Sequence, residues 1–115
     1  MTSALIGFIA VQHVGFLVLE MFLWDTPTGR RIFRLEPEFA ARSRALAANQ
    51  GLYNGFLAAG LIWGLILGAD GWAVKVFFLS CVVVAGAFGA ATVSRRIFWI
   101  QGAPAMAALA LLLIR

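Results

Sequence analysis

Charged residues are scarce in this chain. Only 12% of its 115 residues are Asp, Glu, Lys or Arg, whereas a soluble domain carries about a quarter. Hydrophobic residues make up 63% of the sequence, and the mean hydropathy is +0.94. The composition excludes an ordinary water-soluble domain and predicts an integral membrane protein.

Cysteine and histidine each occur once, as Cys81 and His13. A single cysteine excludes an intrachain disulfide, and one His with one Cys cannot form a zinc cluster within one chain. One histidine also supplies only one axial haem ligand, so a haem-binding bundle is the weakest hypothesis for this sequence. We therefore expect no cofactor and no metal.

Four apolar runs cover most of the sequence. We predict helices over residues 3–24, 38–68, 72–93 and 97–114, each long enough to cross a hydrocarbon core of about 30 Å. Pro37 suits the first helical position and Glu38 the first turn, so the second helix begins ahead of its apolar run at Ala45. The short connections predict a single all-α transmembrane domain over residues 1–115, an up-down four-helix bundle. The first run lacks a basic leader and a cleavage site, and we expect it to remain in the mature protein.

The basic residues are distributed unevenly. Seven arginines lie between the first and second runs or between the third and fourth: Arg30, Arg31, Arg34, Arg42, Arg44, Arg95 and Arg96. Only Lys75 and Arg115 remain for the opposite side. This bias places both Arg-rich loops in the cytoplasm and both termini outside it. The basic pI of about 10.7 is therefore a topology signal that points away from nucleic acid, with attraction to anionic lipid headgroups as a second role.

The Arg-rich loop over residues 25–44 has two readings. Thr26-Pro27-Thr28-Gly29 is typical of a turn. The stretch from Arg30 to Leu35 mixes arginines with apolar residues, so it either lies in the headgroup plane or forms a plain basic loop.

Glycines recur along the second predicted helix, at residues 51, 55, 60, 64 and 68. The GxxxG spacing lets two helix backbones approach closely. We expect Ala85, Gly86, Gly89 and Ala90 of the third helix to receive these glycines within one chain. A homodimer contact through the same glycine-rich faces is the alternative.

Polar residues gather in the half of the bundle predicted to face the cytoplasm. Glu20 is the only carboxylate within an apolar run, where it costs roughly 2.5–3.5 kcal/mol at the helix centre and less near an interface. His13 lies about 10 Å farther along the same helix and on nearly the same face. We expect a polar pocket there, with Glu20 and His13 as candidate catalytic residues and Asn49, Gln50, Tyr53, Asn54 and Gln101 as ligand-binding residues. The sequence leaves open whether the levels of His13 and Glu20 form one pocket.

Glu20 and His13 are too far apart to bond directly, so each needs a partner from another helix. Asn49, Gln50 or Gln101 could serve Glu20, and Tyr53 or Asn54 could serve His13. For the amides, a role as interhelical hydrogen bonds is the stronger reading. For Glu20, a functional role is the stronger reading.

Three stretches carry a resemblance: LEMFLWDTPTGRRIF, LAANQGLYNGFLAAGL and VVAGAFGAATVSRRI. In this order and spacing they resemble a family of small bacterial integral membrane proteins catalogued as domain of unknown function 1304. The resemblance covers nearly the whole chain. It implies four transmembrane helices, a location in the bacterial inner membrane and the same polar positions, but no activity.

Three hypotheses follow for the function. The first is a protein that binds or acts on a small apolar or amphipathic ligand, with Glu20 as acid or base; the residues leave open whether it is an enzyme. The second is a proton-coupled small-molecule transporter with Glu20 as its coupling carboxylate, similar in architecture to small multidrug exporters but without their motifs. The third is a structural or assembly subunit of the membrane. The lipid bilayer is the one partner that all three require.

Overall fold

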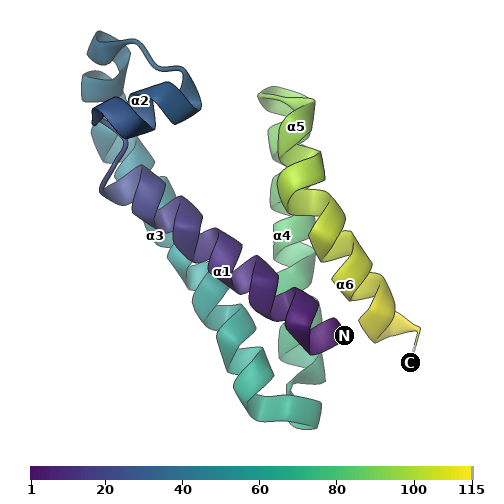
Figure 1. Ribbon diagram of the computed structural model, residues 1–115. Coiled ribbons are helices and arrows are strands. Elements are labelled where there is room, and N and C mark those ends of the chain that lie inside the picture. The colour runs from purple at the N-terminus through teal and green to yellow at the C-terminus, as the bar shows by residue number, and fades with distance from the viewer. Residues whose placement is uncertain (115) are drawn as a thin grey trace. The chain divides into compact units, whose positions relative to one another are not determined.

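The computed structural model describes residues 1–114, and helices and turns without strands make up this range. The elements are α1 (Thr2–Met21), α2 (Pro27–Phe33), α3 (Pro37–Leu67), the 3₁₀ turn η1 (Gly68–Gly71), α4 (Trp72–Thr92), α5 (Arg95–Ile97), the π-helical η2 (Phe98–Gly102) and α6 (Ala103–Leu113) (Figure 1). The all-helical class is therefore confirmed. Arg115, counted above for the outer side, lies outside the described residues.

Three helical segments are long and apolar enough to cross a membrane. They are Thr2–Met21, Pro37–Thr92 and Arg95–Leu113. The second joins α3, η1 and α4, and the third joins α5, η2 and α6. This composition and length suggest a membrane protein.

The chain divides into two compact units. One comprises Met1–Val11 and Leu57–Arg115, and the other comprises Gln12–Phe56. The single transmembrane domain and the four-helix bundle stay predictions.

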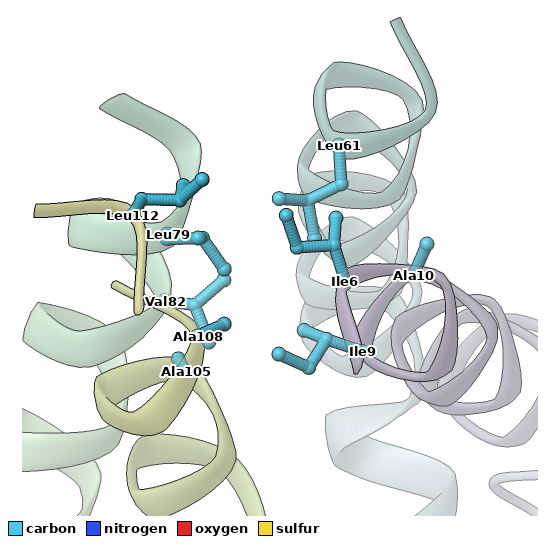
Figure 2. Packing of buried hydrophobic residues seen from close by; sticks show 9 residues of the cluster. All are labelled: Ile6, Ile9, Ala10, Leu61, Leu79, Val82, Ala105, Ala108 and Leu112. Carbon is cyan, nitrogen blue, oxygen red and sulfur yellow. The ribbon is translucent and has the colours of Figure 1, made fainter. Parts of the chain in front are cut away.

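The first unit has an apolar core of nine buried residues. Ile6, Ile9 and Ala10 of α1 and Leu61 of α3 face Leu79 and Val82 of α4 and Ala105, Ala108 and Leu112 of α6 (Figure 2). The residues from α4 and α6 recur at three- or four-residue intervals, so each of these helices presents one face to the core.

The end of α3 and the start of α4 form an antiparallel hairpin around η1. Gly68 adopts a left-handed conformation (φ 63°), which ends α3 and which residues with a side chain rarely adopt. On either side of the turn, a Cβ placed at Gly60 would collide with the Phe78 ring, and one at Gly64 would lie 2.7 Å from Lys75 Cγ. The buried Lys75 donates from Nζ to the Gly68 carbonyl at 3.0 Å, satisfying an acceptor at the helix end.

α4 and α6 run side by side in opposite directions (Figure 1). At one end of the pair, a Cβ placed at Gly86 would lie 2.8 Å from both N and Cα of Gly102. At the other end, Trp72 Nε1 donates to the Leu112 carbonyl at 3.1 Å. Because nothing but backbone separates the helices at Gly86, this is a close approach that only glycine permits.

The fourth predicted helix differs from a regular α-helix near its start. The backbone N–H of Ala103 donates to the Phe98 carbonyl, five residues back, which defines the π-helical turn η2. Pro104 follows directly. A proline lacks an N–H and its ring collides with the carbonyl four residues earlier, here that of Ile100. The wider turn accommodates the proline without ending the helix.

The turn predicted at Thr26–Gly29 is wrong, because these residues begin α2. Thr26 is the N-cap, with its Oγ1 accepting from the Gly29 N–H at 3.2 Å, and Pro27 occupies the first helical position. A threonine followed by proline is a helix-start signal as much as a turn signal. Gly29 is buried against the carbonyls of Leu23 and Trp24, so a side chain at this position would collide with backbone.

The expected contact between the glycines of α3 and those of α4 is also wrong. Gly86 meets Gly102, and Gly89 meets Ile97, so both serve the packing of α4 against the next helical segment. The reason is the register of the α3–α4 hairpin. Gly60 and Gly64 lie close to the turn and pair with Phe78 and Lys75, whereas Gly86 and Gly89 lie much farther along α4.

Candidate functional site

Glu20 is held by two amide side chains from α3. Asn54 Nδ2 donates to Glu20 Oε1 at 2.6 Å, and Gln50 Nε2 donates to Glu20 Oε2 at 3.1 Å. The carboxylate is buried, with 8% of the residue exposed. We call Glu20, Gln50 and Asn54 the Glu20 cluster. Each carboxylate oxygen thus has one donor, which is the arrangement a buried carboxylate requires.

Helical spacing explains which amides reach Glu20. Gln50 and Asn54 are four residues apart and lie on one face of α3, one turn above the other. Asn49 directly precedes Gln50, and Tyr53 directly precedes Asn54. Their side chains are therefore rotated by about 100° around the helix axis from those of the two amides. Asn49 is exposed, and its Nδ2 donates to the Ala45 carbonyl of its own helix at 3.2 Å. Tyr53 is 60% exposed, and its ring packs on Phe56.

Two glycines allow α1 to approach α3 at this point. A Cβ at Gly51 would lie 3.1 Å from Glu20 Cβ and 2.7 Å from Met21 Cγ, and one at Gly55 would lie 2.6 Å from Leu17 Cδ1. Sequence reasoning treated the glycine spacing and the polar residues as separate signals. In the sequence, each amide that bonds Glu20 is directly followed by a glycine, as Gln50-Gly51 and Asn54-Gly55. This pattern indicates that the close helix approach and the polar cluster occur at the same place.

His13 and Gln101 lie elsewhere in the chain. His13 is fully buried on α1, with its ring edge-on to Phe16 at a centroid distance of 5.2 Å. Gln101 is half-buried in the π-helical turn η2 of the first unit. Asn54, offered above as a partner of His13, bonds Glu20 instead, because it shares a face with Gln50.

The Glu20 cluster can hold either protonation state of the carboxyl group. An ionised carboxylate accepts from both amide N–H groups, as the structure has it. When the group is protonated, one oxygen becomes a donor, and an amide can rotate to present its carbonyl oxygen as acceptor. Gln50 and Asn54 therefore suit a carboxyl group that gains and loses a proton, or one that exchanges a hydrogen-bond partner.

The Glu20 cluster contributes to neither of two surface hollows. The described residues form an open apolar hollow along α4 between Phe77 and Phe88, and a polar one between Arg34 and Arg42. Glu20 lines neither of them. A ligand at Glu20 can replace one of the two amides or use a lone pair that the amides leave free.

Comparison with known proteins places the chain in a family. Residues 7–113 match the family described as "Protein of unknown function (DUF1304)". Among curated proteins, the uncharacterized protein YpaA of Lactococcus lactis subsp. lactis (strain IL1403) is 28% identical over 103 residues, covering 88% of this chain and 87% of the relative. No solved structure matches. The family match spans nearly all of the helical segments, and the chain therefore belongs to the DUF1304 family.

Proposed function

We propose that this chain is an integral membrane protein that binds a small apolar or amphipathic molecule at the Glu20 cluster. The observation that carries the proposal is a buried carboxylate with two amide donors, within a helix apolar enough to span a membrane. Intramembrane carboxylates are costly, and those that persist usually serve a function.

A purely structural role explains the amides better than it explains the carboxylate. Two amides can link helices without any charge, and they do so at a smaller desolvation cost than a carboxylate. A carboxylate adds the ability to accept strongly from a ligand hydroxyl or amine, or to transfer a proton. Glu20 is thus the residue whose presence favours ligand chemistry over helix association alone.

The two amides differ in a way that indicates where a ligand enters. Asn54 makes the shorter bond and is half-buried, whereas Gln50 makes the longer bond and is exposed. A hydroxyl or amine arriving from the exposed side can replace Gln50 at Glu20 Oε2. Asn54 meanwhile keeps the carboxylate in place.

The ligand proposal is tested by what copurifies with the protein. Wild-type protein and the Glu20→Gln and Gln50→Ala variants are purified in the same mild detergent, and bound small molecules are identified by mass spectrometry. We expect a species enriched in the wild type to fall at least tenfold in Glu20→Gln, because the variant lacks the charge that strengthens the hydrogen bond. Asn49→Ala is the matched control, since Asn49 bonds its own helix, and it should retain the species.

An identical set of bound molecules in wild type and Glu20→Gln would overturn the ligand proposal. The transporter alternative predicts a different outcome. Proton flux into vesicles that depends on Glu20, without a retained ligand, would favour a coupling carboxylate over a binding site.

We further propose that the protein is a four-helix bundle in the bacterial inner membrane, with both termini outside the cytoplasm. The seven arginines at the α1–α3 and α4–α6 connections support this orientation through the positive-inside bias. The antiparallel pairing of α4 with its neighbours α3 and α6 supports an up-down order.

Cysteine labelling tests the orientation. Cys81 is first replaced by alanine, and single cysteines are introduced at Ser3 and at Thr28, both exposed positions. We expect a membrane-impermeant maleimide to label Ser3→Cys in intact spheroplasts, and Thr28→Cys only after permeabilisation. Thr28 is preferred to Gly29, where a side chain would meet the Leu23 carbonyl. Labelling of Thr28→Cys in intact spheroplasts would reverse the orientation.

A further inference from the structure

A second polar site lies where α2 gives way to α3. A hollow of about 380 Å³ is lined by Arg34, Leu35, Glu36, Phe39 and Arg42. Two arginines and one glutamate thus line the hollow together with two apolar residues. The Glu20 cluster contributes nothing to this lining, so the hollow is a separate feature of the second unit.

Local structure explains how the two arginines come together. Arg34 is the C-cap of α2 in a left-handed conformation (φ 56°, ψ 51°), and it is the one residue other than glycine with a positive φ among residues 1–114. Glycine or asparagine is usual at such a position. The left-handed cap turns the chain sharply before α3 begins at Pro37. Arg42 lies one helical turn beyond Phe39, on the same face of α3.

The positive charges in the lining of the hollow outnumber the negative ones. Arg30 of the same segment forms the single ion pair found in residues 1–114, with Asp25 at 3.0 Å. Arg34 and Arg42 therefore have no carboxylate in ion-pair contact in this range. With Glu36 in the same lining, the hollow carries a formal charge of one positive unit.

The lining matches the chemistry of a phosphate group. Guanidinium groups present donors in a planar fork that fits phosphate oxygens. A net charge of +1 complements the single negative charge of a phosphodiester. Leu35 is half-buried and Phe39 is 48% exposed, so the same hollow also offers apolar surface next to the charges.

We propose that this hollow is a phosphate-binding site in which Arg34 and Arg42 are the ligands. The phosphate belongs either to a phospholipid headgroup or to a free anion. The apolar side chains beside the arginines, and the apolar run that begins at Ala45 on the same helix, favour the headgroup. That preference rests on the membrane location proposed above, whereas the phosphate chemistry does not.

The experiment has a lipid arm and a free-anion arm, both with the full chain. In the first, the protein is delipidated in detergent, and binding of phosphatidylglycerol and of phosphatidylcholine is measured by native mass spectrometry. In the second, inorganic phosphate is titrated against the detergent-solubilised protein by calorimetry. Arg42→Gln and Arg34→Asn are the test variants, and asparagine is chosen because it tolerates the left-handed conformation.

Arg31→Gln and Arg44→Gln are the matched controls, since each removes one positive charge from the same segment at an exposed position outside the hollow. We expect phosphatidylglycerol to bind more tightly than phosphatidylcholine, with about a tenfold loss in either test variant and less than a twofold loss in either control. Binding of inorganic phosphate with the same variant pattern supports the site with a free anion as its source.

Equal losses in all four variants would overturn the proposal, because they would show a diffuse electrostatic attraction. The absence of binding in both arms would overturn it as well. Neither result depends on Glu20, so this proposal and the ligand proposal for the Glu20 cluster can fail separately.

Discussion

Asn54→Leu is expected to lower the free energy of unfolding by about 2 kcal/mol, because hydrogen bonds to charged groups contribute about 1.5–3 kcal/mol. The variant removes the 2.6 Å bond to Glu20 Oε1 and leaves a buried carboxylate with Gln50 as its remaining cluster donor. Gln50→Leu should cost less than about 1 kcal/mol, since its bond is longer and water can replace an exposed amide. Reversible unfolding in mixed detergent micelles provides the measurement.

The double variant Glu20→Leu/Asn54→Leu tests the cause. Replacing both partners of a buried hydrogen bond by apolar groups is often nearly neutral, whereas removing one partner exposes the cost of the other. We therefore expect the double variant to recover most of the stability lost in Asn54→Leu. Asn49→Leu is the control for losing an amide from the same helix, with a change below about 0.5 kcal/mol. Equal losses in Asn49→Leu and Asn54→Leu would show that the Glu20 cluster contributes nothing to stability.

Gly86→Ala is expected to destabilise the protein by about 2 kcal/mol, although alanine is the better helix former. The added Cβ would lie 2.8 Å from the N and Cα of Gly102, and backbone atoms cannot rotate out of its way as side chains can. The contact can be relieved only by moving α4 away from η2, which also disturbs the packing of Ala105 and Val82 in the apolar core.

Two glycines of α1 and α3 serve as graded controls. Gly15→Ala meets nothing within 4 Å and should leave stability unchanged or raise it by up to about 1 kcal/mol. Gly55→Ala meets only the Leu17 side-chain end, which can rotate, so its effect should fall between the other two. Thermal unfolding of the three variants in one detergent measures the series. A melting temperature of Gly86→Ala equal to that of Gly15→Ala would contradict the close approach of α4 to η2.

Much of the secondary structure was predictable, because it depends on local signals. Long apolar runs predict helices of about the length observed, and Pro37 followed by Glu38 predicts the start of α3. Two local features were not predicted from the sequence. The helix α2 was read as a turn because Thr-Pro serves both structures, and the π-helical turn η2 arises from Pro104, two residues after it ends.

The glycine spacing of α3 shows where sequence reasoning stopped. The spacing predicts close helix contacts, and Gly51, Gly55, Gly60 and Gly64 do make contacts within the chain. It does not say which helix each glycine meets. Within the unit of residues 12–56, Gly51 and Gly55 receive α1. Within the other unit, Gly60 and Gly64 receive α4.

The sequence by itself determined the helical class, the apolar segments and the small set of polar residues from which a site could be built. These follow from composition and from the helical period, which are properties of the chain and not of its neighbours. Only the tertiary structure decided that Glu20 is joined by Gln50 and Asn54, and that Asn49 and Tyr53 turn elsewhere. The physical reason is that partner choice depends on the rotation and register of one helix against another. Those quantities are set by packing at Gly51 and Gly55, each of which directly follows one of the bonding amides.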